Sequence, residues 1–241
     1  MSVINVKRES YKAMNSIKGM LLVLCLGASC ANAAVITQTQ NIATHVPNKS
    51  GDLTFNYFDS SKGTLLSVEV VMSVTWWGGY YALDNDSDVA SEGTAKWGID
   101  FKLTDVPGVT STQSSISDSV SDNFSLAKND GDSTSEFNVG GEDYDRLDGP
   151  TYDNRISFDK QIDVAANKIS SFEDSGAFIV PYQSLQYQSF SGLSGNSSSS
   201  SPLSAYGTVT ITYNYTPVPE PATASLACAG LLMLLRRRRQ A

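Results

Sequence analysis

A strict alternation of apolar and mostly polar residues runs through positions 66–76. Its apolar members are Leu66, Val68, Val70, Met72, Val74 and Trp76. Because successive side chains of a β-strand point to opposite faces, this spacing predicts a strand with one buried face. Shorter stretches with the same period lie at 53–57, 97–103, 156–164 and 209–215. No long window between the two ends of the chain has a helical period, so an all-β fold, an antiparallel β-sandwich, is predicted.

Two polar stretches between these strands are predicted to be surface insertions. Residues 105–153 are dense in Ser, Asp and Gly, and residues 189–204 contain the serine run 197–201. Such segments bury too little apolar surface to order themselves, and the serine run is a candidate for disorder.

The first 33 residues have the pattern of a secretory signal peptide. Basic residues precede the apolar run 20–28, and Ala31 and Ala33 are the small residues that a signal peptidase reads. The apolar run is too short to span a bilayer. A buried N-terminal helix is the alternative, but it would not need basic residues ahead of a small-x-small site. Cys30 suggests a lipoprotein, but the residues before it lack the expected large aliphatic side chain.

The last two dozen residues combine prolines, an apolar run and a basic cluster. The parts in order are Pro217, Pro219, Glu220 and Pro221, then residues 222–235, then Arg236, Arg237, Arg238 and Arg239. Prolines cannot extend the preceding strand. The apolar run would span about 21 Å as a helix, short of the roughly 30 Å hydrocarbon core. Arginines after it favour keeping that end in the cytoplasm, so a short, temporary transmembrane helix is predicted. An ordinary core helix, the alternative, does not explain the arginines.

Residues 218–239 resemble the PEP-CTERM sorting signal, in which a Val-Pro-Glu-Pro box precedes a short transmembrane stretch and a basic cluster. The resemblance implies that Pro219, Glu220 and Pro221 form the recognition box. It further implies that the chain is a substrate of an exosortase, a membrane transpeptidase-like enzyme of Gram-negative bacteria that also make exopolysaccharide. The implied route is transient anchoring in the inner membrane, followed by release to the cell surface or extracellular matrix.

The region between the two ends, 34–217, is similar to the choice-of-anchor E domain family. The similarity rests on Ile36-Thr37-Gln38-Thr39, Leu53-Thr54-Phe55, Phe58-Asp59, Gly63-Thr64-Leu65, Ser67-Val68 and Gly207-Thr208-Val209-Thr210. It implies a β-rich surface domain and supplies no known activity. Residues 76–81 and the polar insertion at 105–153 depart from the family pattern.

Charge and cysteine content exclude several classes of function. Between residues 34 and 218 the chain has 23 acidic and 9 basic residues, a net charge of −14 against −8 for the whole chain. A surface this acidic repels nucleic acid. Cys25, Cys30 and Cys228 all lie outside this region, so neither disulfide nor thiol chemistry is predicted in it.

No residue pattern marks a catalytic site. The single histidine, His45, is expected in a loop, and it has no nucleophile-elbow motif or cysteine partner with which to form a triad or a zinc site. Carboxylates are plentiful, but nothing selects the facing pair that a glycan hydrolase needs. The chain is therefore predicted not to be an enzyme, with a secreted glycan hydrolase as one alternative.

Calcium is the one cofactor that the sequence suggests. Acidic residues crowd into two segments, one with Asp84, Asp86, Asp88 and Glu92, the other with Glu142, Asp143, Asp145 and Asp148. Calcium takes six to eight oxygen ligands, and acids spaced along a loop can supply several. The alternative is that these are solvated loop acids. The first segment is not an EF-hand, because Val89 and Ala95 replace its glycine and its final glutamate.

Aromatic residues after the longest alternating strand are the best candidate contact surface. Alternation places Trp76 in the core and Trp77 on the opposite face, and Gly78-Gly79 is expected to turn the chain before Tyr80 and Tyr81. Exposed rings can stack on sugars, so Trp77, Tyr80 and Tyr81 are predicted glycan contacts. The alternative is that they cover the second face of the sheet.

The predicted role is therefore that of a structural or adhesive protein at the cell surface. A carbohydrate-binding module would require exposed coplanar rings, and a hydrolase would require a cleft with two facing carboxylates.

Overall fold

The computed structural model describes residues 32–131, 141–192, 197–218 and 230. The predicted residues Ala31, Pro219, Glu220, Pro221, Arg236, Arg237, Arg238 and Arg239 lie outside this part of the chain, as does the apolar run apart from Gly230. The chain divides into two compact units, and the larger one, Val35–Ser60 with Leu65–Tyr215, contains nearly all strand residues.

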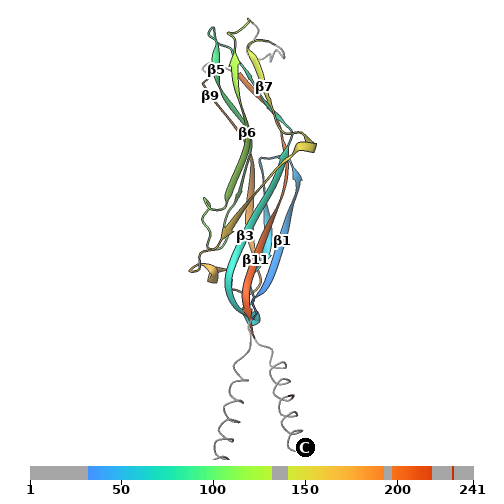
Figure 1. Cartoon of the computed structure of the whole chain (residues 1–241), viewed down its shortest axis with the longest axis vertical. Coiled ribbons are helices and arrows are strands. Elements are labelled where there is room, and N and C mark those ends of the chain that lie inside the picture. The colour runs from blue at the N-terminus through green and yellow to red at the C-terminus, as the bar shows by residue number, and fades with distance from the viewer. Residues whose placement is uncertain (1–31, 132–140, 193–196, 219–229, 231–241) are drawn as a thin grey trace, which may run out of the picture. The chain divides into compact units, whose positions relative to one another are not determined.

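The described chain is all-β and forms three sheets (Figure 1). The first has the order β1 (Ala34–His45), β11 (Ser204–Pro217), β3 (Gly63–Trp77), β8 (Ile156–Asp163). The second has the order β2 (Lys49–Asn56), β9 (Ala177–Ser191), β5 (Ser91–Leu103), β6 (Ser115–Leu126). The third has the order β10 (Ser197–Ser201), β4 (Tyr80–Asp84), β7 (Tyr144–Asp148). Short 3-10 turns are η1 (Ser60–Lys62), η2 (Tyr152–Asn154) and η3 (Ile169–Phe172).

Strand pairing in this fold is antiparallel wherever its register is defined, as in β3–β8, β5–β6, β5–β9, β2–β9 and both pairs of β4. The two four-stranded sheets contribute to one hydrophobic core. The prediction of an antiparallel, β-sandwich-like fold is confirmed.

The alternating strand supplies one wall of this core. Val68, Val70, Met72, Val74 and Trp76 of β3 are at most 2 % exposed, and they join one cluster with Trp97, Ile99, Phe101 and Leu103 of β5. The prediction that Leu66 is buried was wrong. Leu66 is 50 % exposed and Leu65 is buried instead, because two successive exposed residues, Leu66 and Ser67, shift the alternation by one position.

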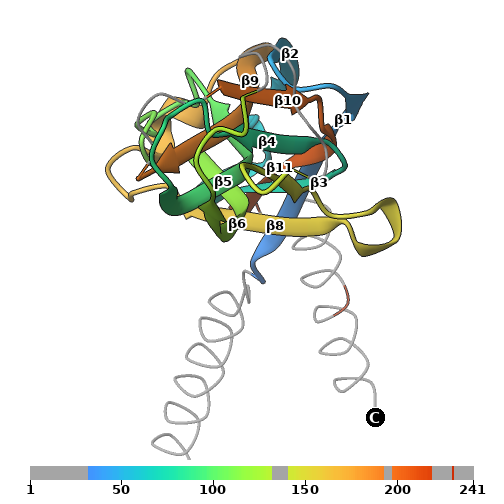
Figure 2. The same cartoon turned by 90° about the horizontal axis from the view of Figure 1, so that it is seen from above.

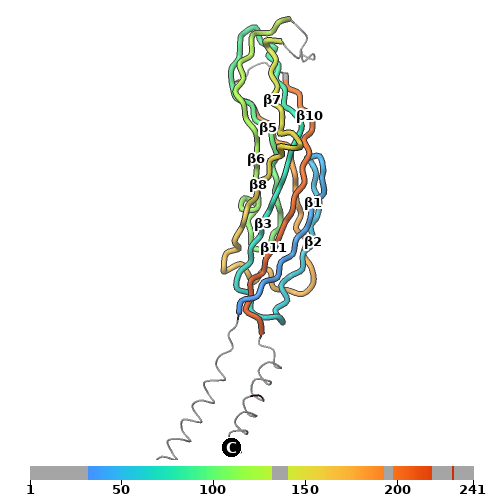
Figure 3. The backbone as a smooth tube through the Cα atoms, turned by 45° about the vertical axis from the view of Figure 1, so that its right-hand side comes forward, coloured from blue at the N-terminus to red at the C-terminus, as the bar shows by residue number. Residues whose placement is uncertain are grey.

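Side chains join the edge strands of the two four-stranded sheets. On one edge the amide of Gln38 in β1 donates to Asn56 O at 2.9 Å and accepts from Asn56 N at 2.8 Å. Gln40 Nε2 donates to Thr54 O at 2.8 Å. Figure 3 shows β1 and β2 side by side along this seam.

The opposite edges are joined in the same manner. Lys160 Nζ of β8 donates to Ser115 O of β6 at 2.8 Å, and Figure 2 shows the two strands side by side. Next to this seam Trp76 Nε1 donates to Asp118 Oδ2 at 2.9 Å, and across the core the Tyr213 hydroxyl donates to Asn56 O at 2.9 Å. Burial raises the pKa of the Tyr213 hydroxyl, so it remains a donor at physiological pH.

Both polar stretches that were expected to be loops contain strands. The stretch 105–153 holds β6 and β7, and the serine run 197–201 is β10. Strand β6 escaped detection because its alternation includes polar residues on the covered side, among them Asp118, the acceptor for Trp76. Strand β10 has no apolar residue at all and is held through its pairing with β4.

Candidate functional site

The Gly78-Gly79 turn positions the aromatic residues between β3 and β4. Both glycines have positive φ, 77° and 71°, a conformation that other residues rarely adopt. Gly78 N donates to Pro150 O at 2.7 Å, and Gly149 N donates to Gly79 O at 3.0 Å. The turn therefore lies against the segment that links β7 to η2, 70 residues along the chain.

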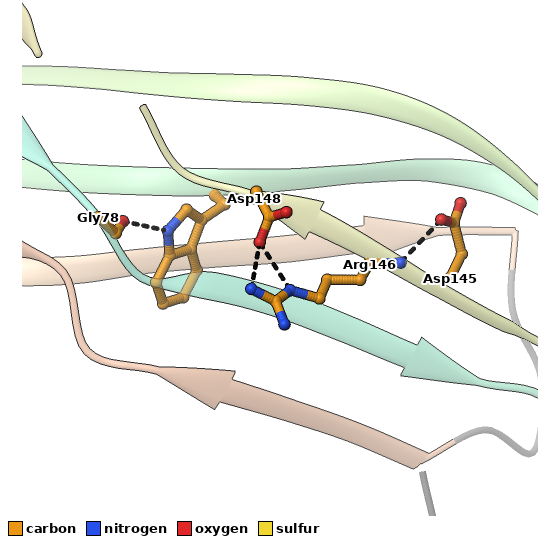
Figure 4. Close-up of polar contacts among 5 residues, drawn as sticks. Gly78, Asp145, Arg146 and Asp148 are labelled. Atoms are coloured by element: carbon orange, nitrogen blue, oxygen red, sulfur yellow. Dashed lines mark hydrogen bonds and ion pairs between the residues drawn. The ribbon is translucent and has the colours of Figure 1, made fainter. Parts of the chain in front are cut away.

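Gly79 is also in close contact with two other parts of the chain. A Cβ at this position would lie 2.7 Å from Ser201 O and 2.8 Å from Trp97 Cζ2. Trp97 Nε1 in turn donates to Gly78 O at 3.4 Å, the contact drawn at Gly78 in Figure 4. The prediction of a turn at the double glycine is confirmed, and its backbone is tightly held.

Trp77 lies on the outer face of the first sheet and is half-buried there, while Trp76 is fully buried. Its ring contacts Tyr152 of η2 at 5.4 Å and Tyr206 of β11 at 5.9 Å, centroid to centroid. The interplanar angles are 80° and 61°, so the rings meet edge to face. Tyr152 is 61 % exposed. These rings form a corner rather than the coplanar platform expected of a flat carbohydrate-binding surface.

Tyr80 and Tyr81 point in opposite directions from β4. Tyr80 is half-buried, and the Arg146 guanidinium lies 4.1 Å from its ring centroid. Tyr81 is 1 % exposed and stacks on Trp97 with an interplanar angle of 2°. Burial raises the pKa of Tyr81 above 10.0, against the opposing effect of its hydrogen bond to Ser198. The prediction that Tyr81 contacts glycan was wrong, because β4 is a central strand whose inner face is covered.

The two arginines of this region both lie over tyrosine rings. Arg146 also forms an ion pair with Asp148, in which Nε and Nη2 each lie 2.6 Å from Oδ1 (Figure 4). Arg155 lies 4.9 Å from the ring centroid of Tyr152, and its Nη1 donates to Tyr152 O at 3.2 Å. We call Trp77, Tyr80, Arg146, Tyr152 and Arg155 the arginine–aromatic strip.

A small cavity between β4, β5, β6 and β7 contains two carboxylates. It is lined by Tyr81, Leu83, Ala95, Asp122, Phe124, Asp145, Arg146 and Leu147. Its volume is about 10 Å³, room for one water molecule. Although Asp122 and Asp145 both line it, a sugar ring does not fit between them, so this cavity is not the cleft that a hydrolase needs.

The two acid-rich segments meet beyond the end of the β4–β7 ladder. Asn85 N donates to Asp143 O at 3.0 Å, and Asp130 N donates to Asp143 Oδ2 at 2.9 Å. Asp84, Asn85 and Asp143 are at most 2 % exposed. The other carboxylate oxygen of Asp143, Oδ1, is buried and has no hydrogen-bond partner among the described residues. Burying a carboxylate in this way is costly unless a cation or a donor compensates it.

The predicted calcium ligands are only partly brought together. Asp84 and Asp86 lie at this junction, whereas Asp88 and Glu92 are exposed, with Glu92 on β5 opposite Ser125. Within the described ranges, no group of three or more His, Cys, Asp or Glu side chains is arranged to hold a metal. Any calcium there would need amide, carbonyl or water oxygens as well, and calcium binding stays a prediction.

The prediction that His45 lies in a loop was wrong, because His45 is the last residue of β1. It is 8 % exposed, its Nδ1 lies 3.0 Å from Ala43 O, and its ring packs near Tyr182. No helix in the described part of the chain is long and apolar enough to cross a membrane.

Comparison with known proteins shows no relationship that identifies a function. No protein-family model and no curated protein matches the chain. Among solved structures, infectious bursal disease virus Gx strain matches with 13 % identity and a TM-score of 0.20, over 87 % of this chain and 49 % of that one. Desmodium yellow mottle tymovirus matches with 9 % identity and a TM-score of 0.17, over 78 % and 93 % of the two chains. The chain thus spans about half the length of the first of these proteins, and scores this low carry no argument.

Proposed function

We propose that the chain is an exported, non-enzymatic protein of the cell surface or extracellular matrix, with a structural or adhesive role. The observation that carries this proposal is the order of features in residues 218–239, where a Val-Pro-Glu-Pro box, an apolar run and four arginines follow one another. By resemblance to the PEP-CTERM signal, the chain is a substrate of an exosortase-type enzyme in a Gram-negative bacterium. Residues 222–235 form a short transmembrane helix that holds it temporarily in the inner membrane.

The limits of the folded strands support removal of both ends. Strand β1 begins at Ala34, the residue that follows the predicted signal-peptidase site at Ala31 and Ala33. Strand β11 ends at Pro217, two residues before Pro219. Cleavage at either place would leave every described strand intact. The β-rich body is also what the resemblance to the choice-of-anchor E family implies.

A carbohydrate-binding role is the second candidate. The rings of the arginine–aromatic strip are not coplanar, so what favours this role is contact with a single sugar chain rather than with a flat surface. Trp77 and Tyr80, both predicted contacts, lie in this strip with the exposed ring of Tyr152. A structural protein associated with exopolysaccharide would use such a surface for adhesion. A glycan hydrolase has less support, since the cavity between Asp122 and Asp145 has room for only one water molecule.

Mass spectrometry of the native protein from inner-membrane, cell-surface and medium fractions tests the proposal. We expect the surface form to begin at Ala34 and to lack residues 222–241. A variant with Pro219, Glu220 and Pro221 replaced by alanine should remain in the inner membrane with its tail attached. Its melting temperature is the control, and it should match that of the unprocessed wild type because the substitutions lie beyond β11. A mature surface protein that still carries residues 226–235 would overturn the proposal.

A further inference from the structure

We propose that the arginine–aromatic strip binds an acidic polysaccharide, a chain whose sugar units carry carboxylate groups such as those of uronic acids. This inference rests on the proposed surface location and gives that role a partner class and a site. The members of the strip form two groups on the two sides of the Gly78-Gly79 turn. Tyr80 lies with Arg146 of β7, and Trp77 lies with Tyr152 of η2 and with Arg155, which follows η2.

The distribution of arginine points to this strip. Among the nine basic residues between 34 and 218, Arg146 and Arg155 are the only arginines, and both belong to it. Their guanidinium groups lie 4.1 Å and 4.9 Å from the ring centroids of Tyr80 and Tyr152. Arginine presents a planar fork of donors that matches a carboxylate and also stacks on aromatic rings, whereas lysine is a compact point charge.

Both guanidinium groups are available to a ligand. Arg155 is exposed, and the partner of its side chain is a neutral carbonyl, Tyr152 O. No carboxylate in the described part of the chain forms an ion pair with it. Arg146 is paired with Asp148, but the two side chains are 44 % and 65 % exposed. Exposed ion pairs contribute little to stability, so exchanging Asp148 for a ligand carboxylate costs little.

The aromatic members supply contacts for the sugar rings themselves. Tyr152 is 61 % exposed, and Trp77 meets it edge to face at 5.4 Å. Such rings combine a large apolar face with a polar group that remains in water. The corner between them suits one hydrated chain better than a flat crystalline surface.

The charge on the rest of the protein restricts where an acidic chain can bind. With 23 acidic and 9 basic residues between 34 and 218, most of the surface repels a polyanion. Binding is therefore confined to the strip, and added salt weakens it because the charges are exposed.

Titration of the full chain with three polymers tests this inference. Binding would be measured by tryptophan fluorescence and calorimetry. Detergent keeps the apolar run 222–235 from aggregating, and EDTA removes divalent cations that could bridge the protein and polymer carboxylates. Polygalacturonate is the uronic-acid polymer, dextran is the neutral sugar control, and poly-glutamate has carboxylates without sugar rings. We expect polygalacturonate to bind with a Kd at least about tenfold lower than either control. Dextran lacks the charge-assisted contact to arginine, and poly-glutamate lacks the sugar rings that contact the aromatic side chains.

Three substitutions assign the binding to the strip. Arg155→Gln and Tyr152→Ala should each raise the Kd for polygalacturonate about tenfold. Lys168→Gln removes the same charge from an exposed position outside the strip and should leave the Kd nearly unchanged. Equal binding of all three polymers, no binding of polygalacturonate, or an equal effect of Lys168→Gln would overturn the inference. None of these results would alter the termini found by mass spectrometry. The sorting route is therefore tested by the termini alone, independently of polysaccharide binding.

Discussion

Gly78 and Gly79 are adjacent and have nearly the same backbone conformation, with φ of 77° and 71°. Their surroundings differ, since a Cβ at Gly78 meets nothing within 4 Å and one at Gly79 meets Ser201 O and Trp97 Cζ2. The pair therefore separates the cost of backbone conformation from the cost of close packing.

Alanine at each glycine should measure these two costs. Gly78→Ala should lower the free energy of unfolding by about 1 kcal/mol, the usual penalty for placing a Cβ in this conformation. Gly79→Ala should cost about 3 kcal/mol or more, because backbone and indole atoms must also move. Urea denaturation of both variants checks the difference. Equal losses would mean that the β3–β4 turn does not pack against β10 and Trp97 as described.

Asp143 poses a different question, since its Oδ1 is buried and no residue in the described ranges donates a hydrogen bond to it. In chelator, Asp143→Asn should raise the melting temperature because it removes a buried charge. In millimolar Ca²⁺ the wild type should gain stability that the variant does not, if calcium binds beside this oxygen. Asp88→Asn, an exposed acid of the other acid-rich segment, is the control and should change neither melt. Identical wild-type melts in calcium and in chelator would remove the calcium hypothesis.

At the level of elements, the sequence predicts best those strands that have one apolar and one polar face. β2, β3, β5, β8 and β11 each contain a stretch recognisable by its period of two. Strands β4, β6 and β10 lack that signal for identifiable reasons. β6 has Asp118 where an apolar residue would be expected, and β10 consists only of serines. In β4, Leu83 and Asp84 are adjacent and both buried, whereas a strand with one solvent-exposed face would expose one of them.

The glutamine seam between β1 and β2 gives a prediction about these edges. Gln38→Ala removes both hydrogen bonds to Asn56, and Gln40→Ala removes the one to Thr54 O. Each change should cost about 1 kcal/mol, with Gln38 the larger, because a typical hydrogen bond contributes about that much. Hydrogen exchange should quicken at the Asn56 amide in the Gln38 variant.

Gln188→Ala is the matched control for the seam, since this exposed glutamine of β9 has no side-chain partner in the described chain. It should leave both stability and exchange unchanged. A loss as large as that of Gln38→Ala would show that the seam contributes nothing of its own.

At the level of the whole molecule, the sequence alone suggests local features of the chain more readily than it suggests a surface. The export and sorting features are local runs, so they can be predicted without a fold, and they stay predictions. The arginine–aromatic strip is not local, because it joins Trp77 and Tyr80 to residues about 70 positions later. Trp77 and Tyr80 were predicted contacts, but nothing in the sequence indicated that Arg146, Tyr152 and Arg155 would lie beside them.

Net charge gives a prediction at the same scale. The region 34–218 carries a charge of −14, and Arg146–Asp148 is an exposed ion pair of little energetic value. Added salt should therefore weaken the repulsion among the acidic side chains by more than it weakens the attraction within ion pairs. We expect the melting temperature to rise between 0.02 M and 0.5 M NaCl. A fall over this range would mean that attractive charge pairs dominate the folded state.

Strand β10 differs from every other strand because all its side chains are alike. Ser197 pairs with Asp84 and Ser201 with Tyr80, and a shift of two residues would still put serine in three of these five positions. What fixes its place is the buried Leu203 just beyond it and the contact of Ser201 O with Gly79. Natural variation could therefore add serines ahead of Ser197 in pairs without altering the neighbours of β4, which makes this strand an adjustable spacer inside an otherwise specified fold.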